Sequence, residues 1–191
     1  MDKHGTAAAA FGLAGASFLL YPVLRPYSDE AVVEGLRVMG TSAWVVAHLF
    51  AVGGFLLVGL GLLAVARSRA AAVTLTGALL TSVYYGAETF GLHAIGSRAA
   101  DDPDPALLDL VDAIRYQPAA ITIFAVGLLA LAAGAVLAAA QLRSRAAIPY
   151  ALGFALFLPQ FFTAPPVRVA HGALLLVGCW LVARELWRRR G

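Results

Sequence analysis

Long apolar runs separated by short polar stretches make up most of the chain. A run of ~20 apolar residues can cross the ~30 Å hydrocarbon core of a bilayer as a helix, and a helix satisfies its own backbone hydrogen bonds in lipid. The pattern therefore predicts an all-α, polytopic membrane protein: one transmembrane domain over residues 1–191 that folds as a six-helix bundle. The predicted spans cover residues 6–24, 42–66, 70–96, 118–141, 147–162 and 167–186.

The first and fifth predicted spans have unusual ends. The first run resembles the start of a signal peptide, but it ends in Tyr21-Pro22 without a small-residue cleavage site, so we predict a retained helix. The fifth span is short and contains Pro159. Proline removes a backbone donor and clashes with the preceding turn, so this span is predicted to bend or unwind near its end.

The loops over residues 28–40 and 97–117 each predict a short helix at the membrane interface. Ser28 is placed to cap the first, with two acidic residues in its first turn. Asp104 is placed to cap the second, with Pro105 at the first helical position. These helices are expected to cover one end of the bundle.

Basic residues indicate the orientation, since cytoplasmic loops carry an excess of lysine and arginine. With the N-terminus in the cytoplasm, nine of the fourteen basic residues fall at cytoplasmic ends and five at outer ends. Both termini are therefore predicted to be cytoplasmic. An alanine-rich composition with arginine preferred over lysine is typical of GC-rich bacterial genomes, which predicts a bacterial cytoplasmic membrane. The nine are Lys3, Arg67, Arg69, Arg143, Arg145, Arg184, Arg188, Arg189 and Arg190, and the five are Arg25, Arg37, Arg98, Arg115 and Arg168.

Composition also excludes some classes of site and partner. The chain is 61% apolar and 13% charged, and Cys179 is its one cysteine, which excludes an intrachain disulfide and a cysteine-based metal site. The basic residues are scattered among loop ends instead of gathering on one soluble face. A nucleic-acid partner is therefore not expected.

One carboxylate, Glu88, lies well inside the third predicted span. An acidic residue at this depth costs a few kcal/mol, so such residues usually face the bundle interior and mark function. Without a nearby cation, desolvation keeps a buried carboxyl protonated, and it can then donate a proton. The alternative is a structural carboxylate bonded to a tyrosine or paired with Arg168 or a histidine.

Other polar residues fall at a similar depth when ~1.5 Å is counted per helical residue. From the outer ends of their helices, Glu88 lies ~12 Å down, His48 ~9 Å, His171 ~6 Å and His93 ~5 Å. Because separate helices agree on this level, we predict one polar pocket that opens outward.

The function predicted from this pocket is that of a small membrane-embedded enzyme acting on a lipid or isoprenoid. Glu88 would be the general acid or base, with Tyr84 and Tyr85 orienting it and His93 as a proton partner. The reaction would be a proton-initiated cyclisation or isomerisation, or a metal-assisted hydrolysis. The predicted substrate-binding residues are Arg168, which would hold an anionic head group, together with Gln160 and Trp44.

The histidines leave other classes open. Three imidazoles and a carboxylate can form a tetrahedral zinc site, and two facing histidines can clamp a haem iron, although no HExxH motif is present. A haem- or metal-binding electron carrier or sensor, a proton-coupled transporter and a structural subunit are therefore alternatives. The candidate metal ligands are His48, His93, His171 and Glu88.

Overall fold

The computed structural model describes residues 2–189, and these residues form helices and turns without a strand. Arg190, counted above among the cytoplasmic basic residues, lies outside them. In chain order the elements are α1 (Lys3–Leu24), the 3₁₀ helix η1 (Val33–Gly40), α2 (Ser42–Val65), α3 (Arg69–Asp101), α4 (Ala106–Arg115), α5 (Pro118–Leu142), the 3₁₀ helix η2 (Arg145–Ala147), α6 (Ile148–Ala155), α7 (Phe157–Gln160) and α8 (Pro165–Arg188).

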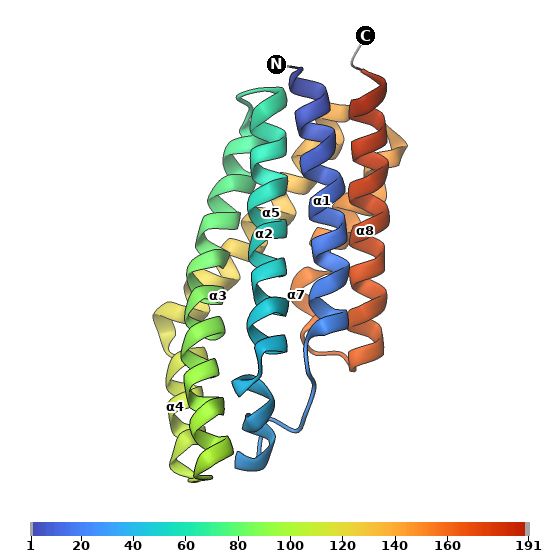
Figure 1. Cartoon of the computed structure of the whole chain (residues 1–191). Helices are drawn as coiled ribbons and strands as arrows, with labels where there is room; N and C mark the ends of the chain where they lie inside the picture. Colours follow the sequence, from blue (N-terminus) through green and yellow to red (C-terminus); the bar gives the residue numbers. More distant parts are fainter. Residues whose placement is uncertain (1, 190–191) are drawn as a thin grey trace.

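The long helices pack side by side as a bundle with both chain ends at the same end of the molecule (Figure 1). Helix α1 packs against α2 and α8, and α3 packs against α2 and α5. Five of the helices, α1, α2, α3, α5 and α8, are long and apolar enough to cross a membrane. The all-helical prediction and most of the predicted spans are therefore confirmed.

The fifth predicted span, 147–162, is not one continuous helix. Helix α6 ends at Ala155, and α7 is a single turn that ends at Gln160. Pro159 explains the break, because its ring would clash with the carbonyl of the residue four positions earlier, which is Ala155. The predicted interruption is confirmed, whereas six full-length spans are not: the segment between α5 and α8 consists of η2 and two short α-helices.

Helix α3 is longer than predicted and extends past the ends of α1 and α8 (Figure 1). Its 33 residues measure about 50 Å, which exceeds a ~30 Å hydrocarbon core. Gly96, the predicted end of this span, does not end the helix. It allows close packing instead, since a Cβ there would strike the backbone of η1 at Gly40 and Leu36.

The two loop helices pack on this extension of α3 and form a small second core. Both predicted helices are present, but the first is a 3₁₀ helix that Ser28 does not cap, since the Ser28 hydroxyl donates to the Gly35 carbonyl at 2.8 Å. The buried residues of this outer core are Val33, Leu36, Met39, Trp44, Leu92, Ile95, Ala99, Leu107 and Val111.

Close contact between α3 and α5 depends on two glycines of α5. A Cβ at Gly134 would overlap Thr74, including its backbone nitrogen, and a Cβ at Gly127 would overlap Thr81 in the same way. We therefore predict that Gly134→Ala lowers the free energy of unfolding by about 1–3 kcal/mol through overpacking. Thermal unfolding in detergent measures this change.

Gly53→Ala is the matched control, because a Cβ at Gly53 has no heavy atom within 4 Å. The control is expected to unfold at the wild-type temperature or slightly above it, since alanine is the better helix former. Equal midpoints for the two variants would show that α3 and α5 do not pack as described.

Candidate functional site

Four charged side chains form a chain of ion pairs between the outer core and the core between the long helices, which we call the main core. The Arg115 guanidinium bridges two carboxylates: its Nε donates to Glu88 Oε1 at 3.0 Å and its Nη1 to Glu30 Oε2 at 2.6 Å. Glu30 Oε1 accepts a further bond from Arg25 Nη2 at 2.8 Å. The four side chains are only 9–22% exposed. We call Arg25, Glu30, Glu88 and Arg115 the charge network.

Three separate parts of the chain supply this network. Glu88 lies in α3, while Arg25 and Glu30 both lie in the loop that follows α1. After α3 ends, the chain reverses through residues 102–105 and α4 leads back toward α5, which brings Arg115, the last residue of α4, to the level of Glu88. The network therefore ties the loop after α1 and the end of α4 to α3.

Opposite charges stabilise the ionised forms of Glu30 and Arg115. Burial alone would raise the pKa of the Glu30 carboxyl, but Arg115 and Arg25 outweigh burial and hold that pKa below its ordinary value. Burial opposes the charge of Arg115, yet Glu88 and Glu30 outweigh it and raise the pKa of the guanidinium above its usual range. Glu88 Oε1 accepts from Arg115 Nε at 3.0 Å, so Glu88 is better described as an ion-paired carboxylate than as a buried acid without a partner.

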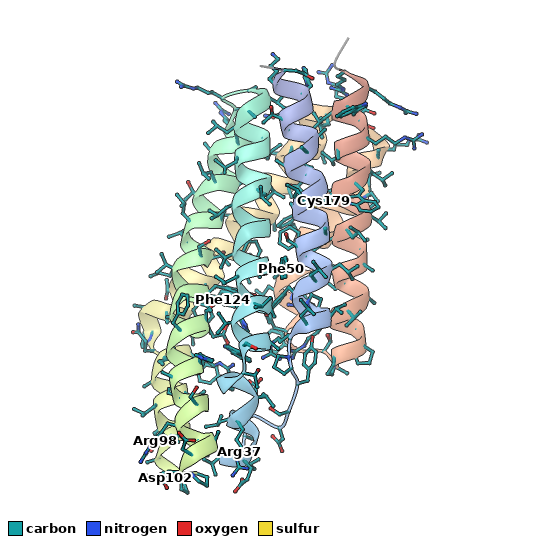
Figure 2. The ribbon with its side chains drawn as sticks, viewed as in Figure 1. Arg37, Phe50, Arg98, Asp102, Phe124 and Cys179 are labelled. Carbon is teal, nitrogen blue, oxygen red and sulfur yellow. The ribbon has the colours of Figure 1, made fainter. Side chains whose placement is uncertain are left out.

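A cavity of about 430 Å³ lies beside the network. Its lining includes the four residues of the network and a third arginine, Arg168 at the start of α8. The other lining residues are mostly apolar and aromatic, and Phe162 among them is 86% exposed. Phe124, one of the lining residues, lies about halfway along the bundle (Figure 2). Arg37 and Arg98, which do not line the cavity, lie at the far end of the bundle. The remaining lining residues are Tyr84, Tyr116, Ile121, Phe124, Ala125, Leu158 and Phe161.

His48 lies directly behind Glu88, fully buried. Its Nδ1 is 2.7 Å from the Trp44 carbonyl, which only accepts, so Nδ1 carries the proton of the neutral ring. Its Nε2 then presents a lone pair to Glu88 Oε2, 4.0 Å away, and has no hydrogen-bond partner. The rings of Trp44, Tyr21 and Tyr85 surround it at 4.2, 5.4 and 5.7 Å between centroids.

The structure does not bring the other two histidines to this place. His93 Nδ1 lies 3.1 Å from the Met39 carbonyl in the outer core, and His171 Nε2 lies 2.8 Å from the Gly153 carbonyl at the end of α6. Within residues 2–189 no group of three His, Cys, Asp or Glu side chains could hold a metal ion. The candidate set of His48, His93, His171 and Glu88 is therefore not assembled, and only His48 and Glu88 meet.

Of the next four predicted site residues, two line the cavity and two do not. Tyr84 and Arg168 line it, and Tyr84 stacks on Phe124 with 4.2 Å between centroids. Tyr85 is buried and donates to the Tyr21 hydroxyl at 3.3 Å, and Gln160 is buried behind the cavity. Over the described residues neither tyrosine hydrogen-bonds the Glu88 carboxylate, so the predicted orienting role falls to Arg115.

Trp44 was predicted to bind substrate, but it does not line the cavity. Its ring is completely buried. The indole N–H donates to the Glu88 carbonyl at 3.4 Å, and the Arg25 guanidinium lies 4.9 Å from the ring centroid. Trp44 therefore supports the network from behind, with a cation–π contact to Arg25.

Sequence reasoning missed Arg25, Glu30 and Arg115 as site residues. The sequence contained a usable signal for Arg115. If two helices form a hairpin that turns near residue 103, residues at equal distances before and after the turn lie at the same level. Arg115, about twelve residues after the turn, then lies near the level of Glu88. Ending the third span at Gly96 hid this relation. The aligned register appears only when α3 is extended to Asp101.

Comparisons with known proteins add no functional information. No protein-family model, curated protein or solved structure matches the chain. Functional inference for this protein therefore rests on the geometry of the network and its cavity.

The depressed pKa of Glu30 predicts a dependence of stability on pH. Its ion pairs contribute fully above the ordinary pKa of 4.5, and the contribution is lost as the pH falls below that value through the lower pKa of the folded protein. We expect the wild-type thermal midpoint to fall steeply below pH 4.5. Glu30→Gln should unfold earlier at neutral pH and show a flatter acid dependence.

Glu34→Gln is the control for this measurement, because Glu34 is exposed on η1 and makes no ion pair within the described part of the chain. The control should keep the wild-type acid slope. An unchanged slope in Glu30→Gln would show that the Glu30 ion pairs do not form.

Proposed function

We propose that this protein lies in a bacterial cytoplasmic membrane with both termini in the cytoplasm. The five long apolar helices support membrane insertion. In this arrangement the segment containing α6 and α7 makes the return crossing between α5 and α8, which agrees with the two chain ends lying together (Figure 1). The excess of basic residues at that end supports the orientation. The cavity and the outer core would then face the outer side.

The protein's proposed task is to bind an amphiphile, a lipid or an isoprenoid, in the cavity. The observation that carries this proposal is the mixed lining of the cavity, which combines three arginines with apolar and aromatic side chains. Binding sites for hydrophobic ligands are mostly apolar, with a few placed polar groups that fix orientation. Arginine is suited to a phosphate or carboxylate head group, since it can donate two parallel hydrogen bonds.

The exposed side chains at the edge of the cavity fit entry of the amphiphile from the lipid. Phe162, Tyr116 and Ile121 line the cavity and are themselves 86, 60 and 44% exposed. Exposed apolar side chains at membrane depth face acyl chains without cost. A lipid could therefore place its tail along these residues while its head group reaches the arginines, without leaving the bilayer.

An acid–base reaction on the bound amphiphile is the second candidate function. The Glu88 carboxylate lines the cavity, and His48 Nε2 lies behind it with no hydrogen-bond partner. As the ion-paired partner of Arg115, Glu88 would act as a general base, and His48 could accept the proton next. A metal-assisted reaction has less support, since His93 and His171 lie elsewhere. Transport also has less support, because no charged side chain of the described residues is buried toward the end that holds the termini.

Comparing lipid extracts from cells that express the wild type or Glu88→Gln tests this second function. Proton abstraction by Glu88 predicts a lipid species that appears only with the wild type. Identical extracts at equal protein levels would contradict chemistry at Glu88 and leave the binding proposal unaffected.

Filling the cavity tests the binding function. Ala125 on α5 lines the cavity, so Ala125→Trp places a large ring where the amphiphile would lie. We expect the purified variant to lose most of the lipid that stays bound to the wild type through detergent washing. Mass spectrometry of the lipid extracted per mole of protein measures the loss.

The neighbouring Val126 provides the control, because it is 49% exposed on the outer surface of α5 and does not line the cavity. Val126→Trp should retain lipid as the wild type does. If both variants retain equal amounts, with unfolding temperatures like that of the wild type, the cavity does not hold the lipid.

A further inference from the structure

The charges around the cavity do not cancel. Within the network, two arginines face two carboxylates, and every one of the four groups has at least one partner of opposite charge. Arg168 is the fifth charged group of the cavity lining, and no carboxylate of the described residues pairs with it. The cavity therefore has a surplus of one positive charge, located at Arg168.

Arg168 is held in place by neutral groups. Its Nε donates to the Thr163 carbonyl at 3.0 Å and its Nη2 to the Phe161 carbonyl at 2.7 Å. These two bonds fix the guanidinium against the turn between α7 and α8, and its carbon lies 5.9 Å from the centroid of the Tyr27 ring. A guanidinium has five N–H donors, so three are left without a partner among residues 2–189.

We propose that the amphiphile bound in this cavity has a head group with one negative charge, a phosphodiester or a carboxylate, and that Arg168 is its cation. This inference rests on the proposed binding function. One negative charge neutralises the surplus and satisfies the free donors of Arg168. A neutral or zwitterionic head group leaves a cation without a net counter-charge in a largely apolar space, which is costly.

The same geometry disfavours a second negative charge. Arg25 and Arg115 are occupied by Glu30 and Glu88, and both carboxylates also line the cavity. A phosphomonoester carries up to two charges and would bring the second one toward these carboxylates, where like charges repel. The network therefore acts as a filter on head-group charge, while the exposed apolar edge accommodates the tail.

The test compares head groups on the purified full-length chain by native mass spectrometry, at equal lipid concentration and chain length. The probes are phosphatidylglycerol with one negative charge, phosphatidylcholine with none, phosphatidic acid as the phosphomonoester, and a fatty acid as the carboxylate. We expect phosphatidylglycerol to bind on the order of tenfold more tightly than phosphatidylcholine, because both offer a phosphodiester to Arg168 but the choline ammonium brings a positive charge back into the cavity, so the surplus is not neutralised. It should also bind more tightly than phosphatidic acid.

Variants assign the preference to Arg168. Arg168→Gln should bind phosphatidylglycerol and phosphatidylcholine equally, while Arg168→Lys, which keeps the charge, should retain the order of the wild type. Arg37→Gln is the matched control, since Arg37 is exposed on η1 at the far end of the molecule and does not line the cavity (Figure 2). It should behave as the wild type.

The outcomes separate this inference from the binding function. Tight binding that ignores head-group charge, or that favours phosphatidic acid, would overturn the inference and leave the binding function standing. A preference that survives in Arg168→Gln would overturn the role of Arg168. No retained lipid of any kind would overturn both. If Arg168→Gln does not fold, the order in which the wild type binds the four probes still tests the preference for a single negative charge. Binding of the fatty acid shows whether the site recognises a phosphodiester specifically or any group with one negative charge.

Discussion

The ion pair between Arg115 and Glu88 determines how the outer end of this molecule is built. A carboxylate inside an apolar helix requires a partner, because an unpaired charge in a low-dielectric interior costs several kcal/mol. None of the long helices supplies the primary partner from its own apolar face. The chain instead brings a cation from outside the bundle: α3 extends past its neighbours, the chain reverses, and α4 returns Arg115 to Glu88 at 3.0 Å.

The rest of the outer end follows from this arrangement. Arg115 has a second carboxylate, Glu30, which in turn holds Arg25 directly after α1. The loop after α1, η1 and α4 are thereby gathered on the extension of α3, where their apolar residues form a core of their own. The charge network lies between this outer core and the main core of the bundle. A break in the network would remove the tie of the loop after α1 and the end of α4 to α3, at the level where the cavity lies.

The sequence was a good guide to the helices and a poor guide to their partners. Apolar runs placed the five long helices closely, and Pro159 placed the interruption before α8. Glu88 stood out because a carboxylate in an apolar span is costly wherever it is found. Its partners could not be identified in the same way, since Arg25, Glu30 and Arg115 lie in loops where charged residues are common. Only the reversal of the chain after Asp101 makes Arg115 special.

The histidines show the opposite error. His48, His93 and His171 share an approximate depth, but depth along separate helices fixes neither the direction of a side chain nor its partner. Each ring is held by a backbone carbonyl, at Trp44, Met39 and Gly153 respectively, and these three carbonyls lie in different parts of the fold. Only His48 faces Glu88. Arg168 lines the cavity from the first turn of α8, and no carboxylate of the described residues pairs with it, which adds the charge surplus that the sequence alone did not reveal.

The most direct test of this account is a double-mutant cycle on Arg115 and Glu88, measured as free energies of unfolding in detergent. Arg115→Met alone should cost about 3 kcal/mol or more, because it leaves two buried carboxylates without their shared cation. The Arg115→Met, Glu88→Gln double variant should be at least ~1 kcal/mol more stable than the sum of the single effects predicts. Additive effects, within about 0.5 kcal/mol, would show that the two groups do not interact and would contradict the account.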